Sequence, residues 1–147
     1  MLFNFEKSNN LSNSTVGYQC VYKFQFTEAD VIKFAEVTGD NNPVHLDKNY
    51  AEATIFKKPI VHGFYVGSVF SRIFGTSYPG IGTIYLNQTM SFLAPVFTNT
   101  FYYASVLVKE VDIIKGKAIV VTEVLDENQS KILTGEAQIK SQIYRNI

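Results

Sequence analysis

An acid and an imidazole lie close together in the segment "TGDNNPVHLDKNYA", which runs from residue 38 to residue 51. Asp40 and His45 are five residues apart, on either side of Pro43. A proline cannot lie inside a helix without breaking it, and it pushes the preceding Asn42 toward extended conformations. The chain must therefore bend, and a bend can bring two side chains to one point. An acid and an imidazole held together can share general acid and base catalysis, each contributing a factor of about 10² to 10⁴ in rate.

The same residue types also suit an ordinary connection between two helices. Asp, Asn and Pro are common in turns, where their side chains bond to nearby backbone amides. Asp40 could satisfy local amides, and Asp47 could cap the next helix. The spacing alone leaves both interpretations open, a proton-transfer site and a structural turn.

A second candidate group is the backbone amide of Gly63 in "PIVHG". Gly63 is expected to open a helix, so its amide would point outward with the positive end of the helix dipole behind it. One such donor can stabilise a developing oxyanion and contribute a factor of about 10² to 10³ in rate. The structural alternative is that glycine permits close packing at the start of the helix.

His62 precedes Gly63 and, with His45 and Asp40, suggests a possible metal site. Two histidines without a His-Glu-x-x-His spacing make a poor zinc site, so we predict no metal. We expect His62 to be a buried histidine that is hydrogen-bonded to the backbone.

Composition excludes several classes of protein. The chain has 147 residues, enough for one domain, and its hydrophobic content of 46% is sufficient for a packed core. Its 13 basic and 13 acidic residues cancel, and no basic stripe suggests nucleic acid as a partner. The single cysteine, Cys20, excludes an intrachain disulfide framework. No apolar run reaches the roughly 18 residues needed to span a membrane, and the first ten residues do not resemble a signal peptide. We expect a cytoplasmic protein without a membrane partner.

The N-terminal part of the chain is expected to be a loose lead-in to a single domain. Residues 1–14 form the predicted flexible lead-in, because "KSNNLSNS" within it is polar, and residues 15–147 form the domain. Apolar residues alternate from Val16 to Phe26, which predicts a half-buried strand.

Helix signals follow that strand. "TEAD", which begins at Thr27, is typical of a capping box, and the helical spacing after it ends at Gly39, a common C-terminal stop. A short second helix is expected to begin at Asp47.

The C-terminal half predicts one apolar helix followed by strands. The segment 59–75 is apolar nearly all round, which is typical of a buried helix. Four β-rich runs then follow, separated by turn residues, at 83–94, 100–111, 117–126 and 131–139. Five strands and one apolar helix indicate an α+β fold, with an antiparallel five-stranded sheet wrapped around a central buried helix.

Several motifs together resemble a known family. "GDNNPVHLD", then "KPIVHG", then Ser71 eight residues beyond Gly63, then "SFLAPVF" are similar to the MaoC-like hot-dog proteins, specifically the (R)-specific enoyl-CoA hydratases. The resemblance runs from about Phe26 to Lys140. Every fixed position of the pattern Gly-Asp-x-Asn-Pro-x-His-x-Asp is filled, by Gly39, Asp40, Asn42, Pro43, His45 and Asp47.

The resemblance implies a hot-dog fold and a hydro-lyase reaction without a cofactor. The reaction would hydrate a trans-2-enoyl thioester to a (3R)-hydroxyacyl thioester, or reverse that step. Asp40 and His45 would hold and deprotonate the attacking water, and the Gly63 amide would polarise the thioester carbonyl. Four further residues are expected to support these groups or the substrate: Asn42, Pro43, His62 and Ser71.

The resemblance also implies partners and leaves alternatives. The substrate would be an acyl-CoA or acyl-carrier-protein thioester, and Lys57 and Lys58 could attract its phosphates or be a solvated loop pair. Tyr65, Phe70 and Phe74 could line an acyl channel or belong to the core. A homodimer is expected, since hot-dog domains usually pair by extending their sheets. The alternatives are a hot-dog acyl-CoA thioesterase, the catalytic subunit of a heterodimeric 3-hydroxyacyl-carrier dehydratase, and a non-catalytic module that binds acyl thioesters.

Overall fold

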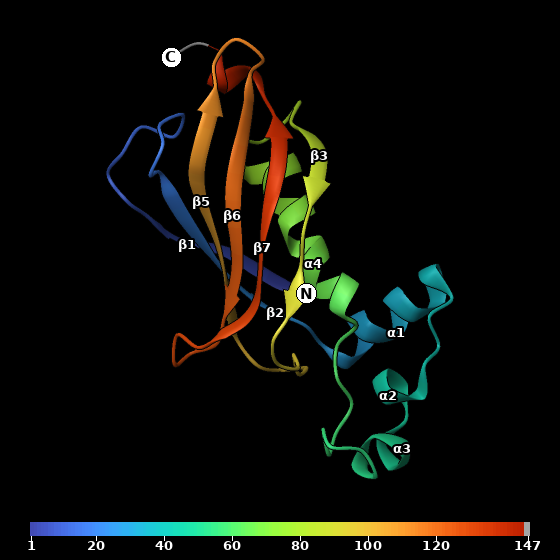
Figure 1. The fold of residues 1–147 in the computed structure, drawn as a ribbon. Coiled ribbons are helices and arrows are strands. Elements are labelled where there is room, and N and C mark those ends of the chain that lie inside the picture. The colour runs from blue at the N-terminus through green and yellow to red at the C-terminus, as the bar shows by residue number, and fades with distance from the viewer. Residues whose placement is uncertain (146–147) are drawn as a thin grey trace.

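A seven-stranded antiparallel sheet forms the main body of the computed structural model, which describes residues 1–145 (Figure 1). Its strand order is β1-β2-β5-β6-β7-β3, and β4 pairs with β7 beside that path. The strands are β1 (Leu2–Ser8), β2 (Gln19–Gln25), β3 (Ile84–Gln88), β4 (Ser91–Phe92), β5 (Tyr102–Asp112), β6 (Lys117–Leu125) and β7 (Lys131–Lys140). The predicted α+β hot-dog class is confirmed. Two more strands are present than predicted, because the run 83–94 divides into β3 and β4 and because β1 was not expected.

Four α-helices and two short helical turns accompany the sheet within the described residues. They are α1 (Glu28–Thr38), α2 (Pro43–Leu46), α3 (Lys48–Glu52), α4 (Gly63–Arg72), the π-helical turn η1 (Ile73–Ser77) and the 3-10 turn η2 (Gln142–Tyr144). Helix α4 lies against the sheet, whereas α1, α2 and α3 form an extension beyond one end of it (Figure 1). No helix in residues 1–145 is both long and apolar enough to cross a membrane.

Strand β1 occupies part of the segment that was expected to be a flexible lead-in. It pairs antiparallel with β2 at one edge of the sheet. The rings of Phe3 and Phe5 pack on Tyr22, with centroids 5.2 and 5.6 Å away, and the Arg72 guanidinium lies 4.1 Å over the Phe3 ring. These aromatic contacts explain why a short, mostly polar segment joins the sheet. The predicted domain ended at residue 147, and residues 146 and 147 lie outside the described part.

Local hydrogen bonds fix both ends of α1 as the sequence predicts. The Thr27 hydroxyl accepts from the Asp30 amide at 3.2 Å, and the Asp30 carboxylate accepts from the Thr27 amide at 2.8 Å. At the other end Gly39 has φ of 77° and donates its amide to the carbonyl of Ala35. That left-handed conformation favours glycine, so the direction in which the chain leaves α1 is set by this residue.

Side-chain caps also fix the two helices that follow. Pro43 is the first residue of α2. An amide at that position has no partner within the helix, so a proline, which lacks the amide hydrogen, costs no hydrogen bond there. The Asn42 side chain accepts a hydrogen bond from the Val44 amide at 3.2 Å. Asp47 accepts from the Tyr50 amide at 2.9 Å and caps α3, so the predicted second helix is confirmed. Helix α2 was not predicted as a separate element, because it is a single turn.

Helix α4 is buried on one side only. Its buried residues, which include Val66 and Phe70, face the sheet. Four exposed residues recur at the spacing of a single helix face: Phe64, Ser68, Ser71 and Arg72. The apolar helix of the sequence analysis therefore keeps one open stripe, on which Phe64 is 72% exposed.

Three glycines allow unusually close contacts between elements. A Cβ on Gly67 of α4 would lie 2.5 Å from the Met90 sulfur, and one on Gly63 would lie 2.8 Å from the Phe92 ring. The tightest case is Gly135 of β7, where a Cβ would lie 1.8 Å from the carbonyl oxygen of Thr89. Backbone bonds around Thr89 hold it beside β7, since its amide donates to Glu136 at 2.9 Å. The connection between β3 and β4 thus depends on the absence of a side chain at 135.

The substitution Gly135→Ala is expected to lower the free energy of unfolding by about 3 kcal/mol, because neither backbone segment can move without breaking strand pairing. Urea denaturation of the wild type and of Gly135→Ala measures this change in the free energy of unfolding. Gly75→Ala is the matched control, because a Cβ at Gly75 meets nothing within 4 Å. It is expected to change stability by less than about 1 kcal/mol, in the stabilising direction, through its higher helix propensity. Equal midpoints for the two variants would contradict the steric account.

Candidate active site

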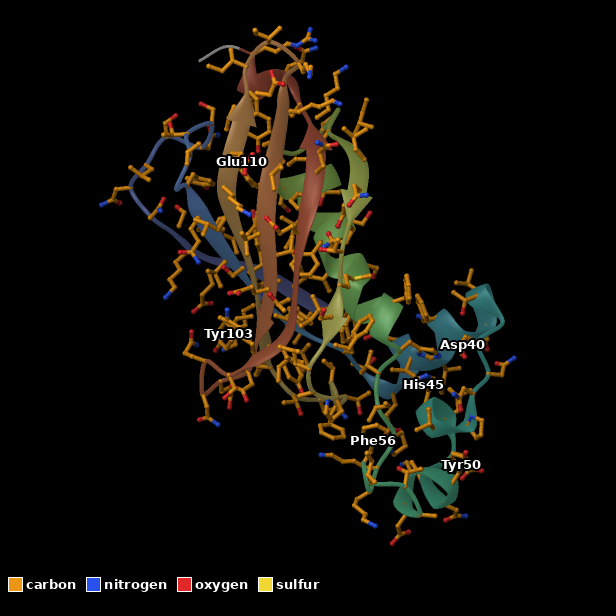
Figure 2. All side chains as sticks on the ribbon, viewed as in Figure 1. Asp40, His45, Tyr50, Phe56, Tyr103 and Glu110 are labelled. Carbon is orange, nitrogen blue, oxygen red and sulfur yellow. The ribbon has the colours of Figure 1, made fainter. Side chains whose placement is uncertain are left out.

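Three of the predicted site residues come together where α1, α2 and the start of α4 meet. One ligand-capable atom from each of Asp40, His45 and His62 lies within 4.8 Å of the others. Figure 2 shows Asp40 and His45 side by side in the extension, away from Tyr103 and Glu110 on the sheet. The predicted bend after α1 thus brings the acid and the imidazole to one place.

His45 is held in one orientation and one tautomer. Its Nδ1 lies 2.8 Å from the backbone carbonyl oxygen of Ile60. A carbonyl oxygen only accepts hydrogen bonds, so Nδ1 must carry the hydrogen and Nε2 keeps its lone pair. The Ile60 amide in turn donates to the Val44 carbonyl at 3.2 Å. The imidazole is therefore positioned with an unprotonated nitrogen available.

The surroundings of His45 favour its neutral form. Burial lowers the pKa of the imidazole from its ordinary value of 6.5, and the neighbouring His62 lowers it further. The Ile60 carbonyl and the Asp40 carboxylate raise the pKa but do not outweigh the other two effects. A neutral imidazole at neutral pH is the form that can accept a proton from water.

Asp40 presents a largely unoccupied carboxylate. Its side chain is exposed, and one oxygen accepts a long hydrogen bond of 3.3 Å from the Asn42 amide. The other oxygen accepts no hydrogen bond from any side chain or amide of residues 1–145. Asn42 and Pro43 shape this loop through their capping positions, as the structural interpretation of the sequence predicted. The loop is thus both a capped turn and a platform for an accessible acid.

His62 lies beneath this pair. It is 2% exposed, its Nε2 lies 3.0 Å from the Asp40 carbonyl oxygen, and its ring stacks on His45 with centroids 3.8 Å apart and planes at 28°. The expected buried histidine bonded to backbone is confirmed. Asp40, His45 and His62 could each offer one atom to a metal ion. The absence of a metal from this cluster stays a prediction.

Gly63 is the first residue of α4, with His62 as its N-cap. The amides of a first helical turn have no partner within the helix, so they remain available to a ligand. The Phe92 ring occupies the place of a Cβ at Gly63, which confirms the close packing expected of a glycine here. The oxyanion role of its amide stays a prediction.

An apolar cavity of about 580 Å³ adjoins His45 and Gly63. Its walls come from four separate parts of the chain, one of which is His45, and include Ile55, Phe56, Phe64, Phe92, Pro95 and Leu133. A cavity made of these residues was not predicted, although Phe92 and Pro95 lie in the motif "SFLAPVF", because strand pairing and the return of the loop before α4 bring its walls together. Periodicity gave no signal for that arrangement.

Several other predicted positions lie elsewhere. Phe70 and Phe74 belong to the buried core, and Tyr65 stacks on Phe34 with centroids 4.6 Å apart. Ser71 is exposed in the last turn of α4, eight residues or about 12 Å along the axis from Gly63. Its predicted support of the acid stays a prediction.

Lysines line a second cavity of about 350 Å³ that also adjoins His45 and Ile60. Lys57 and Lys58 are among them, and the Lys58 ammonium lies 4.1 Å over the Phe97 ring. Glu28 also lines this cavity, so its charge is mixed. Attraction of the substrate phosphates by Lys57 and Lys58 stays a prediction, as does the alternative of a solvated loop pair.

Comparison with known proteins places this site in a family. The family described as "MaoC like domain" matches residues 12–130. The chain belongs to the MaoC-like family. Among its relatives, the (R)-specific enoyl-CoA hydratase of Aeromonas caviae is 38% identical over 125 residues, which cover 85% of this MaoC-like chain and 93% of the relative.

Two further comparisons support that membership. A mitochondrial 3-hydroxyacyl-acyl-carrier-protein dehydratase of Solanum lycopersicum is 32% identical over 114 residues, covering 76% of this chain and 68% of the relative. The solved structure of an (R)-hydratase from A. caviae involved in PHA biosynthesis superimposes with a TM-score of 0.82, covering 86% of this chain and 96% of that one. The MaoC-like fold and the motif that suggested it thus agree.

In an NMR titration, the His45 imidazole is expected to show a pKa below 6.5, because burial disfavours the charged ring. Asp40→Asn is expected to lower this pKa further, since the carboxylate favours the imidazolium. The chain has two histidines, so a His62→Gln variant assigns both rings. A pKa at or above 6.5, or one unchanged by Asp40→Asn, would contradict this description of the site.

Proposed function

We propose that this MaoC-like protein is a lyase that hydrates trans-2-enoyl thioesters to (3R)-hydroxyacyl thioesters and catalyses the reverse dehydration. The observation that carries the proposal is the pairing of an accessible Asp40 carboxylate with a His45 ring that keeps one nitrogen unprotonated. The apolar cavity beside Gly63 supports it, since an acyl chain needs such a surface. The similarity to an (R)-specific enoyl-CoA hydratase over 85% of the chain supports it further.

In this proposal, Asp40 and His45 hold one water molecule between them. The water oxygen bonds to C3 of the enoyl group as the pair removes a proton, and the pair returns a proton to C2. We assign these steps to the pair as a unit, because both groups lie at one point and the geometry does not distinguish their roles. The net reaction adds one water molecule across the double bond, with the hydroxyl on C3 and the hydrogen on C2. No electrons pass to or from a cofactor, so the chemistry requires no redox cofactor.

The remaining groups act on the thioester and the loop. The Gly63 amide would donate to the thioester carbonyl, where negative charge develops as C3 is attacked. Asn42 and Pro43 fix the loop that carries the acid, and Ser71 is proposed to support the site. The carrier is coenzyme A or an acyl carrier protein. A cytoplasmic location is part of the proposal and is supported by the single free, buried Cys20.

Asp40→Asn is expected to lower kcat for crotonyl-CoA by at least about a hundredfold, because the substitution keeps the shape of the side chain and removes its charge. The measurement follows the loss of absorbance of the conjugated enoyl thioester. Asp112→Asn, at the last residue of β5 and at the end of the sheet far from α1, is the matched control and is expected to leave kcat unchanged.

Other outcomes would redirect the proposal. Release of free thiol without loss of the enoyl group would indicate a thioesterase. Equal rates for wild type and Asp40→Asn would place the chemistry elsewhere. A folded wild type that hydrates neither short nor long enoyl thioesters would contradict hydration by this chain alone and would favour a heterodimeric dehydratase or a binding module.

We further propose that two copies pair along β3. This strand ends the sheet, and unpaired edge strands are natural sites of strand addition. Its exposed residues Ile84 and Leu86 are apolar, as are the nearby exposed Phe92 and Phe64. The opposite edge strand β1 also exposes two apolar residues, Leu2 and Phe5, but its other exposed residues are polar. An apolar edge next to an open helix stripe favours an interface there.

Sedimentation analysis is expected to give twice the chain mass of 16.6 kDa for wild type. Leu86→Lys is expected to give the mass of a single chain, because a charge on the edge opposes strand pairing. Ile114→Lys is the control, since Ile114 is 90% exposed in the turn after β5 and should not affect the mass. A single-chain mass for wild type would overturn this arrangement.

A further inference from the structure

His62 contacts both members of the proposed catalytic pair. Its Nε2 is 3.0 Å from the backbone carbonyl oxygen of Asp40, and its ring stacks on His45 at 3.8 Å. Phe34 packs against the same ring, with centroids 4.9 Å apart. One buried side chain therefore touches the backbone of the acid and the ring of the base.

The two histidines form reciprocal ties between two segments of chain. His45 donates to the carbonyl of Ile60, which lies in the segment that carries His62. His62 reaches back to the carbonyl of Asp40, which lies in the segment that carries His45. Because carbonyl oxygens only accept, Nε2 of His62 must carry its hydrogen. The bond from His62 thus fixes the loop of the acid to the N-cap of α4.

The other nitrogen of His62 indicates why a histidine is needed here. Nδ1 is buried and has no hydrogen-bond partner within residues 1–145. An unsatisfied buried polar atom costs about 1 to 3 kcal/mol, a cost that an apolar ring of similar size would avoid. Residues that break a packing rule in this way are expected at functional sites. The structure therefore favours a role for His62 that depends on the hydrogen bond from its Nε2 to the Asp40 carbonyl.

The loop of Asp40 has few other restraints. Within residues 1–145, the Asp40 amide donates only to the Thr38 hydroxyl, at 3.3 Å, and the Asp40 carboxylate accepts only from the Asn42 amide, also at 3.3 Å. The hydrogen bond from His62 to the Asp40 carbonyl, at 3.0 Å, is shorter than these two bonds. Of the three hydrogen bonds to Asp40, it alone comes from a residue distant in the sequence. It also comes from the residue next to Gly63, so it relates the acid to the proposed oxyanion donor.

We propose that His62 is a positioning residue, which holds Asp40, His45 and the Gly63 amide in one arrangement for hydration. This inference rests on the proposed function. His62 touches neither water nor substrate in this role. It acts through the carbonyl of Asp40 and the face of the His45 ring.

Three substitutions at position 62 distinguish the hydrogen bond to Asp40 from the packing of the ring against His45. His62→Phe keeps a flat ring against His45 and removes the hydrogen bond to Asp40. His62→Gln places an amide nitrogen near the position of Nε2 and keeps that bond. His62→Asn is polar as well but one methylene too short to reach, so it serves as the matched partner of the Gln variant and as a second test if the Phe variant does not fold.

His62→Phe and His62→Asn are each expected to lower kcat for crotonyl-CoA by about 10- to 100-fold, with KM changed by less than about threefold, because a small misplacement of a catalytic group lowers kcat more than it weakens binding. His62→Gln is expected to retain kcat within about fivefold of wild type. The Asp40→Asn substitution is expected to cost less in the His62→Phe background than in wild type, since both act on the same group.

Tyr144→Phe is the control for stability loss alone. It removes a buried hydroxyl that pairs with Tyr78 at 3.1 Å, near the C-terminal end of the chain and away from the site (Figure 1). It is expected to lower the thermal midpoint without changing kcat. If His62→Phe and His62→Asn behave like this control, or if His62→Gln loses as much kcat as His62→Asn, the positioning role is overturned.

Imidazole ¹⁵N spectra give a readout that does not depend on activity. The two histidines of the chain are both at this site, and the expected pattern is hydrogen on Nε2 of His62 and on Nδ1 of His45. Hydrogen on Nδ1 of His62 would overturn the inference in an active enzyme. The expected tautomers in a wild type without hydratase activity would instead overturn the proposed function, and the role of His62 in it.

Discussion

Two ring-to-carbonyl hydrogen bonds hold this site together. One runs from His45 to Ile60 and the other from His62 to Asp40, so each of two distant segments provides a donor to the other. Both bonds are partly buried, so breaking one would leave a partly buried imidazole N–H without its acceptor, which costs free energy. The two bonds therefore fix the position of the loop after α1 relative to the start of α4. The relative orientations of Asp40, His45 and the first-turn amides of α4 follow from that position.

The features that the sequence predicts are those set by neighbours in the chain. The capping box at Thr27, the left-handed Gly39 and the cap at Asp47 each depend on atoms within four residues, and all three were identified correctly. The bend at Pro43 and the motif around it also indicated that Asp40 and His45 would meet. Local chemistry thus predicted that an acid and an imidazole would lie together, and their catalytic role stays a prediction.

Features that depend on distant contacts were not predictable in the same way. The tie between His62 and Asp40 spans 22 residues, and no local pattern specifies which carbonyl a buried imidazole will find. The apolar cavity needs strand pairing to assemble its walls. Strand β1 carries Phe3 and Phe5 at strand spacing, and both pack on Tyr22, but the polar run that begins at Lys7 favoured a flexible lead-in. The open stripe of α4 depends on how the helix lies against the sheet.

The close approach of Gly67 to Met90 has an evolutionary consequence. A methyl group at position 67 would require the flexible Met90 side chain to move aside or become smaller, so the volumes at these two positions are coupled. Members of the family that enlarge the helix residue should carry a compensating reduction on the facing segment. Directed evolution that varies one position at a time would discard both halves of such an exchange, whereas a library that varies the pair together would reach new packings of α4 with the packing density conserved.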